Sequence, residues 1–468
     1  MQRALSQHPM AIACFIFGIL TALEILCSRC LYADGAHEFI RVLEAQNFVS
    51  LMWSRHFSFY VFEFPLVLAI KMGVTNMHLL RLAFGAGCFL PWPAVLLFCR
   101  QVSPKHFWLA AAACAAGFLN AAFMAVGEHI LAHAFFWSSL FAILFARPLK
   151  PLAAIVLLIS AVCFLFSYES QLFLCPPLAI LSLWRIAEEK NMASRKENYW
   201  QWIVLLAAAG LFVAASGIGL YAVLNPEIPT NFGGLYANVE NLLWHKGWTL
   251  TWTIVWACLM LAVWFSEKTW KILTRRPAMI IQIGALLIWG TWPLLRPDQL
   301  DTATQYDNRI LDLLVPMMLL PVALIIRYRP ALIVPKERFL AQMAAILLAV
   351  QSTWQICATL QWQKDVGRLQ NLLSTYAGVI PLRSTVLANS SMESRMAEFD
   401  WSWPCLSIAL NRSPNIQSMV CSELYLDPNF NLWQPFNPLD AKTLPDLQHF
   451  GINFNEYKSA ITPNAQQK

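Results

Sequence analysis

The chain has 468 residues and a formal net charge of +6, with 58% hydrophobic and only 13% charged residues. Its mean hydropathy of +0.51 is far above that of soluble globular proteins. Composition therefore excludes an ordinary soluble domain and predicts an all-α polytopic membrane protein. The small positive excess lies mostly in loops between apolar runs, so no nucleic-acid partner is expected.

Apolar runs long enough to cross a bilayer core of about 30 Å begin after a short basic N-terminus. The first run lacks a following small-residue cleavage site, so we interpret it as an anchor. The stretch 57–72 carries Glu63 and Pro65 and is ambiguous by length alone. Without it the sequence predicts about 11 transmembrane helices. They are expected at residues 11–31, 79–99, 107–126, 130–145, 152–168, 172–184, 202–224, 250–265, 278–295, 310–326 and 339–360.

Positive charges decide how the stretch 57–72 lies. If it crossed the membrane, the basic loops 185–196 and 267–276 would face outward, against the positive-inside tendency. If it lies at the outer interface, these loops and residues 327–338 are cytoplasmic. The second topology is our prediction, with a cytoplasmic N-terminus and interfacial helices in an outer loop over residues 33–78.

The transmembrane domain is predicted to cover residues 1–360 and to be followed by a small extracytoplasmic domain over residues 361–468. This segment has a mixed polar composition, which favours α/β or irregular structure, and residues 385–388 could form a strand. Cys405 and Cys421 lie in it, where disulfides can form. A bridge between them and two unpaired buried thiols are equally expected.

The predicted topology gathers polar residues at the outer face. The first of them, Asp34, follows directly after the first span, where a carboxylate can meet a lipid-borne substrate at the water boundary. The others that we expect there are His37, Glu38, Arg55, His56, Glu63, Glu128, His129 and Glu169.

The order of these motifs resembles the GT-C glycosyltransferases, and within them the branch of protein mannosyltransferases and lipid A aminoarabinose transferases. The motifs that carry the resemblance are Asp34-Gly35-Ala36-His37-Glu38, the aromatic stretch 55–60, the step from Gly73 to Arg81, a span ending in Cys99-Arg100, Gly127-Glu128-His129, and Asp307-Asn308-Arg309.

The resemblance implies transfer of a hexose or pentose, with inversion, from a polyprenyl-phosphate donor in the membrane to a glycan, lipid or protein acceptor. The implied place is the outer face of a bacterial inner membrane, with the C-terminal domain in the periplasm. An acceptor hydroxyl needs a base that removes its proton as it attacks, and Asp34 is the candidate. Glu38 follows on the same face if the segment is helical. The alternative for Asp34 is an N-cap of that helix.

The lipid phosphate that leaves needs a fixed cation, and Arg309 is the leading candidate for it. Its alternative is a pair with Asp307 or a snorkelling interfacial arginine. Arg55, with His56 and Glu63, would contribute to substrate binding. Weaker alternatives to Arg309 are Arg55, Arg296, His245 and Lys246.

Glu128 and His129 interrupt an apolar hairpin and could orient the acceptor, share a proton or bind a divalent cation, the single cofactor considered. A satisfied polar turn is their alternative, and Glu169 has the same two interpretations. Glu24 lies inside the first span, where a buried hydrogen bond is the commoner outcome.

Two other function classes remain open. A transporter or flippase for a lipid-linked substrate would show repeated halves and ionisable groups near mid-membrane, whereas here the polar groups collect at one face. A polysaccharide polymerase or ligase would also act on lipid-linked sugars, through a large later outer loop.

Overall fold

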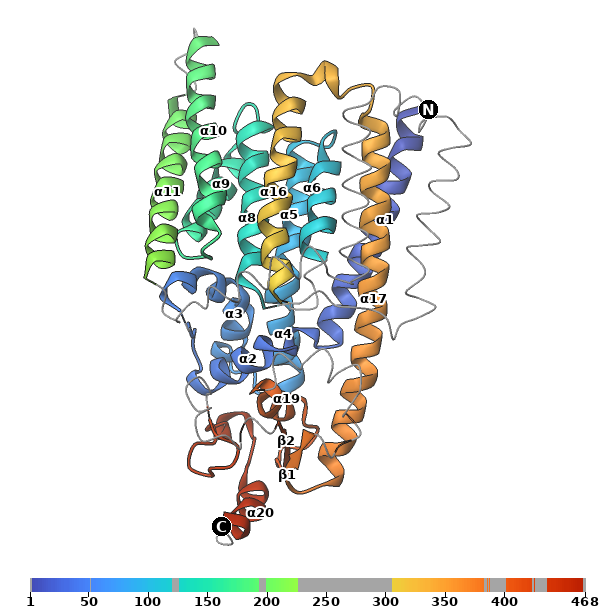
Figure 1. Cartoon of the computed structure of the whole chain (residues 1–468), viewed down its shortest axis with the longest axis vertical. Helices are drawn as coiled ribbons and strands as arrows, with labels where there is room; N and C mark the ends of the chain where they lie inside the picture. The colour runs from blue at the N-terminus through green and yellow to red at the C-terminus, as the bar shows by residue number, and fades with distance from the viewer. Residues whose placement is uncertain are drawn as a thin grey trace.

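A computed structural model describes residues 2–50, 52–119, 126–192, 199–225, 305–382, 385, 387, 401–422, 425 and 436–465, with side chains except at 2–8, 190–192, 305–313 and 462–465. The chain forms an elongated bundle of helices. Its N-terminus lies at one end and its C-terminal segment at the other (Figure 1).

Three described helices are long and apolar enough to cross a membrane, and a pair bent by 43° would make a fourth span. The bend falls where a helix restarts at a proline, which cannot donate the backbone hydrogen bond that would continue the preceding turn. These helices are α1 (Gln2–Leu26), α11 (Tyr199–Leu224), α17 (Glu337–Thr375) and the pair α4 (Met77–Phe89) and α5 (Pro91–Val102).

Other expected spans are occupied by further helices, so the described residues show a helical membrane bundle but not the full number of spans. The expected spans 250–265 and 278–295 lie outside the described residues. The further helices are α6 (Phe107–Ala113), continued by the π-helical η3 (Cys114–Phe118), α8 (Glu128–Leu144), α9 (Pro151–Phe164), α10 (Gln171–Met192) and α16 (Gln305–Tyr328).

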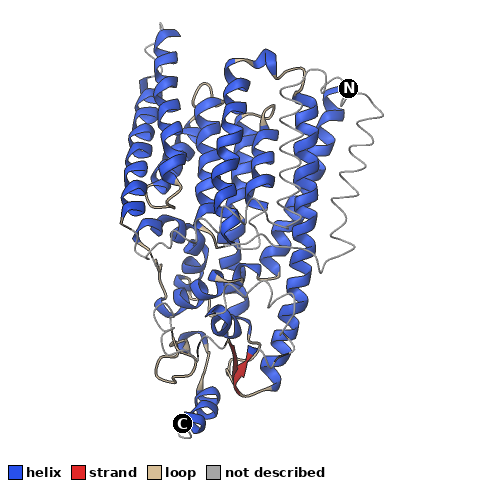
Figure 2. Ribbon diagram, viewed as in Figure 1, coloured by secondary structure: helices blue, strands red, loops and turns tan. Residues whose placement is uncertain are grey.

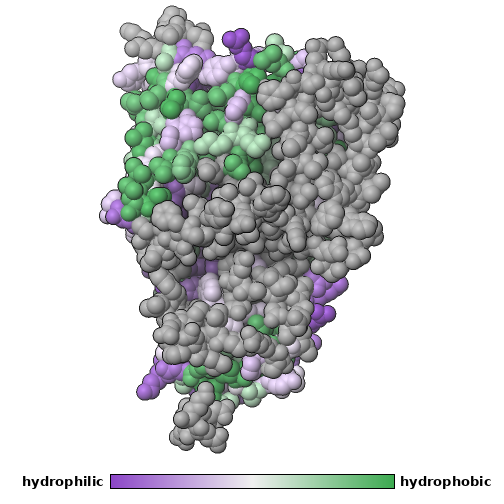
Figure 3. Space-filling view, viewed as in Figure 1, coloured by the Kyte–Doolittle hydropathy of each residue, from purple (hydrophilic) through white to green (hydrophobic). Residues whose placement is uncertain are grey.

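Large apolar side chains are exposed on the outer faces of these helices. Phe15 on α1, Ile155 on α9 and Val213 on α11 are among them. Figure 3 shows the apolar surface over the part of the bundle that contains α10 and α11. Contiguous exposed apolar surface of this kind suits the acyl chains of a bilayer.

Short elements after the first span lie at the end of the bundle away from the N-terminus (Figure 1). One of them occupies the ambiguous stretch 57–72, and its start is fixed by a hydrogen bond from the Phe57 amide to the Phe166 carbonyl (2.9 Å). Among the described residues it is not one of the candidate spans, and it exposes Tyr60, Phe64 and Leu68 at intervals of four residues. This stripe suits a helix lying at the membrane interface. The elements are η1 (Arg29–Leu31), α2 (Asp34–Ala45), η2 (Trp53–Arg55) and α3 (His56–Lys71).

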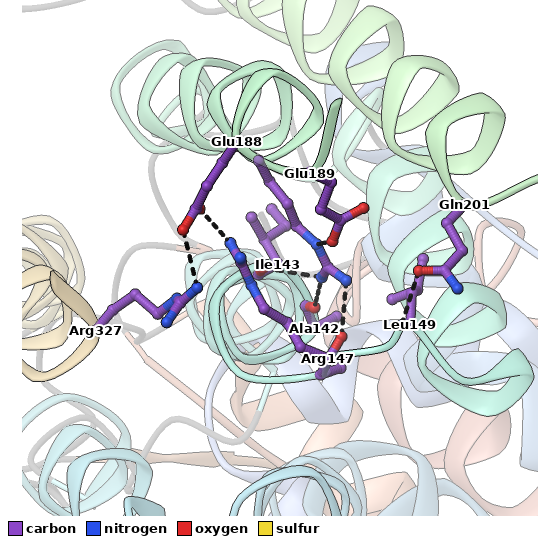
Figure 4. A network of polar contacts seen from close by, with 10 residues as sticks. Ala142, Ile143, Arg147, Leu149, Glu188, Glu189, Gln201 and Arg327 are labelled. Atoms are coloured by element: carbon purple, nitrogen blue, oxygen red, sulfur yellow. Dashed lines mark hydrogen bonds and ion pairs between the residues drawn. The ribbon is translucent and has the colours of Figure 1, made fainter. Parts of the chain in front are cut away.

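Basic residues gather at the opposite end, together with the N-terminus and the η6 turn (Pro330–Leu332) between α16 and α17. Glu188 accepts from Arg147 (2.7 Å) and from Arg327 (3.1 Å), which joins α10, α16 and the loop after α8 (Figure 4). Arg185 donates to three carbonyl groups at the end of α8. The described parts of two basic loops, at the end of α10 and at residues 327–338, therefore share one end of the molecule, whereas the basic loop 267–276 lies outside the described residues.

The C-terminal segment forms a small mixed structure against α2 and α17. Its two strands, the red pair in Figure 2, are β1 and β2, which pair in parallel with Gly378 opposite Ser418. The predicted strand at 385–388 is wrong, since Thr385 and Leu387 lie in a bend and a turn after β1. Cys405 and Cys421 are both buried and unpaired as thiols. The elements are β1 (Gly378–Pro381), α19 (Trp403–Leu410), β2 (Ser418–Cys421), η10 (Gln448–Phe450) and α20 (Asn455–Ala465).

Candidate functional site

A tight turn places Asp34 at the start of α2. The Gly35 amide donates to the Tyr32 carbonyl (3.0 Å), and Ala33 has a φ of 51°, which a residue with a side chain rarely adopts. A Cβ on Gly35 would stand 1.7 Å from the Cys30 carbonyl oxygen, so only glycine fits there. Asp34 is half-buried as the first residue of the helix, and the N-cap position belongs to Ala33.

Two further carboxyl groups, those of Glu38 and Glu63, interact electrostatically near Asp34. Glu38 on α2 and Glu63 on α3 are almost fully buried, and the charge of Glu63 acts on Glu38. The Val49 amide donates to Glu63 Oε2 (2.9 Å). Three carboxyl oxygens have no hydrogen-bond partner among the described residues: both oxygens of Glu38 and Oε1 of Glu63. The negative charges felt by Glu38 come from Glu63, Asp34 and Glu128, in that order.

Burial changes the protonation of these two groups. It raises the pKa of Glu63 to about 8, although the Val49 amide and the Arg41 charge act in the opposite direction. Burial, and next the charge of Glu63, raise the pKa of Glu38 well above its ordinary value. Removing a carboxylate from water disfavours its charged form, and a second carboxylate nearby adds to that cost. Near neutral pH, Glu38 and Glu63 therefore hold protons.

Arg55 joins the start of α3 to the start of α8. Its guanidinium contacts Glu128 (3.1 Å) and Glu169 (2.9 Å) and lies 4.8 Å from the centre of the Tyr168 ring. Burial alone would lower the pKa of Arg55, but the two carboxylates outweigh it and raise the pKa. Such a charge-assisted bracket fixes the outer turns of three helices relative to one another.

The two histidines predicted to bind substrate lie in different surroundings. His129 is buried, with its ring centre 5.8 Å from that of Tyr168. It packs so closely that a Cβ on Gly127 would stand 2.6 Å from its ring. The ring of His56 stacks on Tyr60 one turn later in α3, with the centres 5.9 Å apart.

The predicted phosphate ligand Arg309 belongs to α16, but its side chain lies outside the described side chains. The start of α16 is at the same end of the bundle as α2 and α3 (Figure 1). Arg296, His245 and Lys246 lie outside the described residues altogether. The structure thus brings Glu63, Asp34 and Glu128 close enough to Glu38 to act on it electrostatically, and it links Arg55 with Glu128 and Glu169. The place of Arg309 in this group stays a prediction.

The sequence analysis did not single out Arg41, which acts electrostatically on Glu38, Glu63 and His37. The sequence pattern that could have pointed to Arg41 is its spacing of seven residues from Asp34, because residues seven apart on a helix lie on nearly the same face. His37 was expected only as an outer polar residue, yet its ring packs edge-on against Trp401 at 5.1 Å. Burial lowers the pKa of His37 to about 3, and Arg41 acts in the same direction, so the ring is neutral.

Within the described part of the chain, no three His, Cys, Asp or Glu side chains are arranged to hold a metal ion. Comparison with protein-family models, with curated proteins and with solved structures finds no match for this chain. The chemistry of the site must therefore be argued from its own residues.

Proposed function

We propose that the chain is a membrane glycosyltransferase of the GT-C type. It moves a sugar from a polyprenyl-phosphate donor to an acceptor hydroxyl at the outer face of the membrane. The observation that supports this most is the cluster of Asp34, Glu38, Glu63 and Glu128, held at one end of an apolar helix bundle. A reaction between a membrane lipid and an acceptor in water needs acid and base groups at such a boundary.

Asp34 is the base in this proposal. As the acceptor oxygen forms its bond to the anomeric carbon, its proton passes to Asp34. The bond from that carbon to the phosphate oxygen breaks, and the electron pair leaves with the lipid phosphate. Glu38 and Glu63 are less suited to take the proton, because both already hold one near neutral pH. They keep the region beside Asp34 nearly neutral and set its shape.

The proposed location is the bacterial inner membrane, with the N-terminus in the cytoplasm and the C-terminal segment in the periplasm. The gathering of Arg147, Arg185 and Arg327 at the N-terminal end supports this orientation. Helix α3 would lie in the outer leaflet interface with its apolar stripe against lipid.

Transfer can be tested with purified protein in proteoliposomes, radiolabelled polyprenyl-phosphate sugars and a membrane extract as the acceptor source. We expect label to leave the carrier and to appear in a glycoside. Movement of the intact labelled carrier across the bilayer, with no glycoside formed, would instead identify a flippase and refute the proposal.

A further inference from the structure

The two arginines at the acidic end of the bundle differ in their partners. Arg55 is bound by two carboxylates and covered by the Tyr168 ring. Arg41 is half-buried, and among the described residues it makes no hydrogen bond and no ion pair. A cation that is matched by two anions has little charge left for a ligand, whereas an unmatched guanidinium can bind one in a bidentate manner.

The two buried carboxyl groups near Arg41, Glu38 and Glu63, do little to neutralise its charge. Burial keeps Glu38 and Glu63 protonated near neutral pH, as their raised pKa values indicate. Glu44 also interacts electrostatically with Arg41, but it is exposed on the same helix, where solvent screens the interaction. An arginine beside protonated acids attracts anions, although the residue types alone suggest an acidic pocket.

Position on α2 relates Arg41 to the proposed base. Asp34, Glu38 and Arg41 follow one another at intervals of four and three residues, which places them on one face of the helix. The two half-buried ends of this row are separated by about 10 Å along the helix axis, at about 1.5 Å per residue. A sugar phosphate can lie between two side chains at that separation.

A lipid chain can reach this position. Helix α3 buries Glu63, which interacts electrostatically with Arg41, and exposes Tyr60, Phe64 and Leu68 along a neighbouring stripe of the same helix. Since a helix with its side chains is about 10–12 Å across, the apolar surface lies within one helix diameter of the buried acid. A membrane lipid along α3 would hold its headgroup at the level of the cluster.

We propose that Arg41 binds the phosphate group of the polyprenyl carrier, which rests on the proposed function and assigns the cation that it requires. In this arrangement the sugar ring lies along α2, with the acceptor near Asp34 and the leaving phosphate near Arg41. Arg41 stabilises the charge that grows on the phosphate as the glycosidic bond breaks.

The first test measures binding of a short-chain polyprenyl monophosphate, and of the matching polyprenol without phosphate, to protein in nanodiscs. We expect Arg41→Gln to weaken phosphate binding by about 10- to 100-fold and Arg41→Lys to weaken it less. Arg100→Gln, which removes an exposed charge from α5, should bind as the wild type does. Polyprenol should bind weakly and equally to all variants. Wild-type phosphate binding by folded Arg41→Gln would overturn the assignment.

A second test uses the unaltered protein and so does not depend on a variant folding. Butanedione modifies accessible arginines, and mass spectrometry gives the rate at Arg41, with the carboxylate-bound Arg55 as a slow reference. Polyprenyl monophosphate should slow the reaction at Arg41, whereas polyprenol should not. Equal protection by phosphatidic acid or by inorganic phosphate at the same concentration would contradict a carrier site.

These outcomes separate the two proposals. Arg41-dependent phosphate binding without any glycoside formation would refute the transferase and leave a lipid-phosphate site. Glycoside formation that persists in Arg41→Gln, with unchanged phosphate binding, would refute only the assignment of Arg41.

Discussion

Glu63 shows how position rather than residue type decides the chemistry of a carboxyl group. The sequence predicted that Glu63 would belong to the outer polar set, because it lies in an apolar stretch that does not cross the membrane. It could not predict the protonation, because burial and the nearby Glu38 depend on how α2 and α3 pack. Arg41 was not predicted for the same reason, since its proximity to Glu63 depends on the packing of α2 against α3 and not on nearby residues in the sequence.

The raised pKa of Glu63 makes stability depend on pH. Unfolded, the group ionises near its ordinary value of 4.5, but in the folded chain only near 8. Its contribution is therefore complete below the unfolded value and is lost as pH rises through the folded value. We expect the melting temperature in detergent to fall between about pH 5 and pH 8, and to fall less in Glu63→Gln.

Glu456→Gln is the matched control, because Glu456 is exposed on α20 and should leave the pH dependence as in the wild type. A melting temperature of Glu63→Gln that falls as steeply as that of the wild type would show that Glu63 is not the group responsible.

At the scale of elements, α1 and α17 are joined by a buried polar network. Arg29 donates to Glu24 (2.9 Å), to Thr359 (2.8 Å) and to the Gln355 side chain (2.8 Å). The Gln355 amide in turn donates to the Leu119 carbonyl beyond η3 (2.7 Å). The sequence analysis expected a buried hydrogen bond for Glu24, but its partners on α17 lie too far along the chain for any local pattern to reveal.

Removing Arg29 should be costly because it leaves Glu24 buried without its cation. We expect Arg29→Met to destabilise the protein by about 3–5 kcal/mol, and the double variant Glu24→Gln with Arg29→Met to be less destabilised than the single one. Thermal unfolding of the four proteins of this cycle in detergent gives the coupling. If the two substitutions changed the free energy of unfolding additively, Glu24 and Arg29 would not be energetically coupled.

Other elements show the same limit of sequence. The apolar runs predicted many helices correctly. A helix makes its backbone hydrogen bonds within its own segment, and its apolar residues are consecutive in the sequence. The strand was misplaced because β1 is defined by pairing with β2, some forty residues later, and its own residues carry little β pattern. Arg55 likewise finds Glu128 and Glu169 at separations of 73 and 114 residues.

At the scale of the whole molecule, the two ends of the bundle have opposite character. One end carries arginines matched by Glu188 and Glu189, together with the N-terminus. The other carries buried carboxyl groups beneath the C-terminal segment, whose Trp401 packs on His37 behind Asp34. Composition predicted the apolar helical bundle, and the described arginines Arg147, Arg185 and Arg327 lie at one end of it, whereas the cytoplasmic orientation of the basic loops stays a prediction. Which helices lie side by side could not be predicted from the sequence, because it depends on how their side chains pack.

The central claim is that Asp34 is the base for sugar transfer at the acidic end. Its most direct measurement is the rate of glycoside formation by Asp34→Asn, with Glu456→Gln as a control that removes an exposed carboxylate from α20. We predict that Asp34→Asn lowers the rate by about 10²- to 10⁴-fold at an unchanged melting temperature, while Glu456→Gln keeps the wild-type rate. A wild-type rate in folded Asp34→Asn would contradict the account.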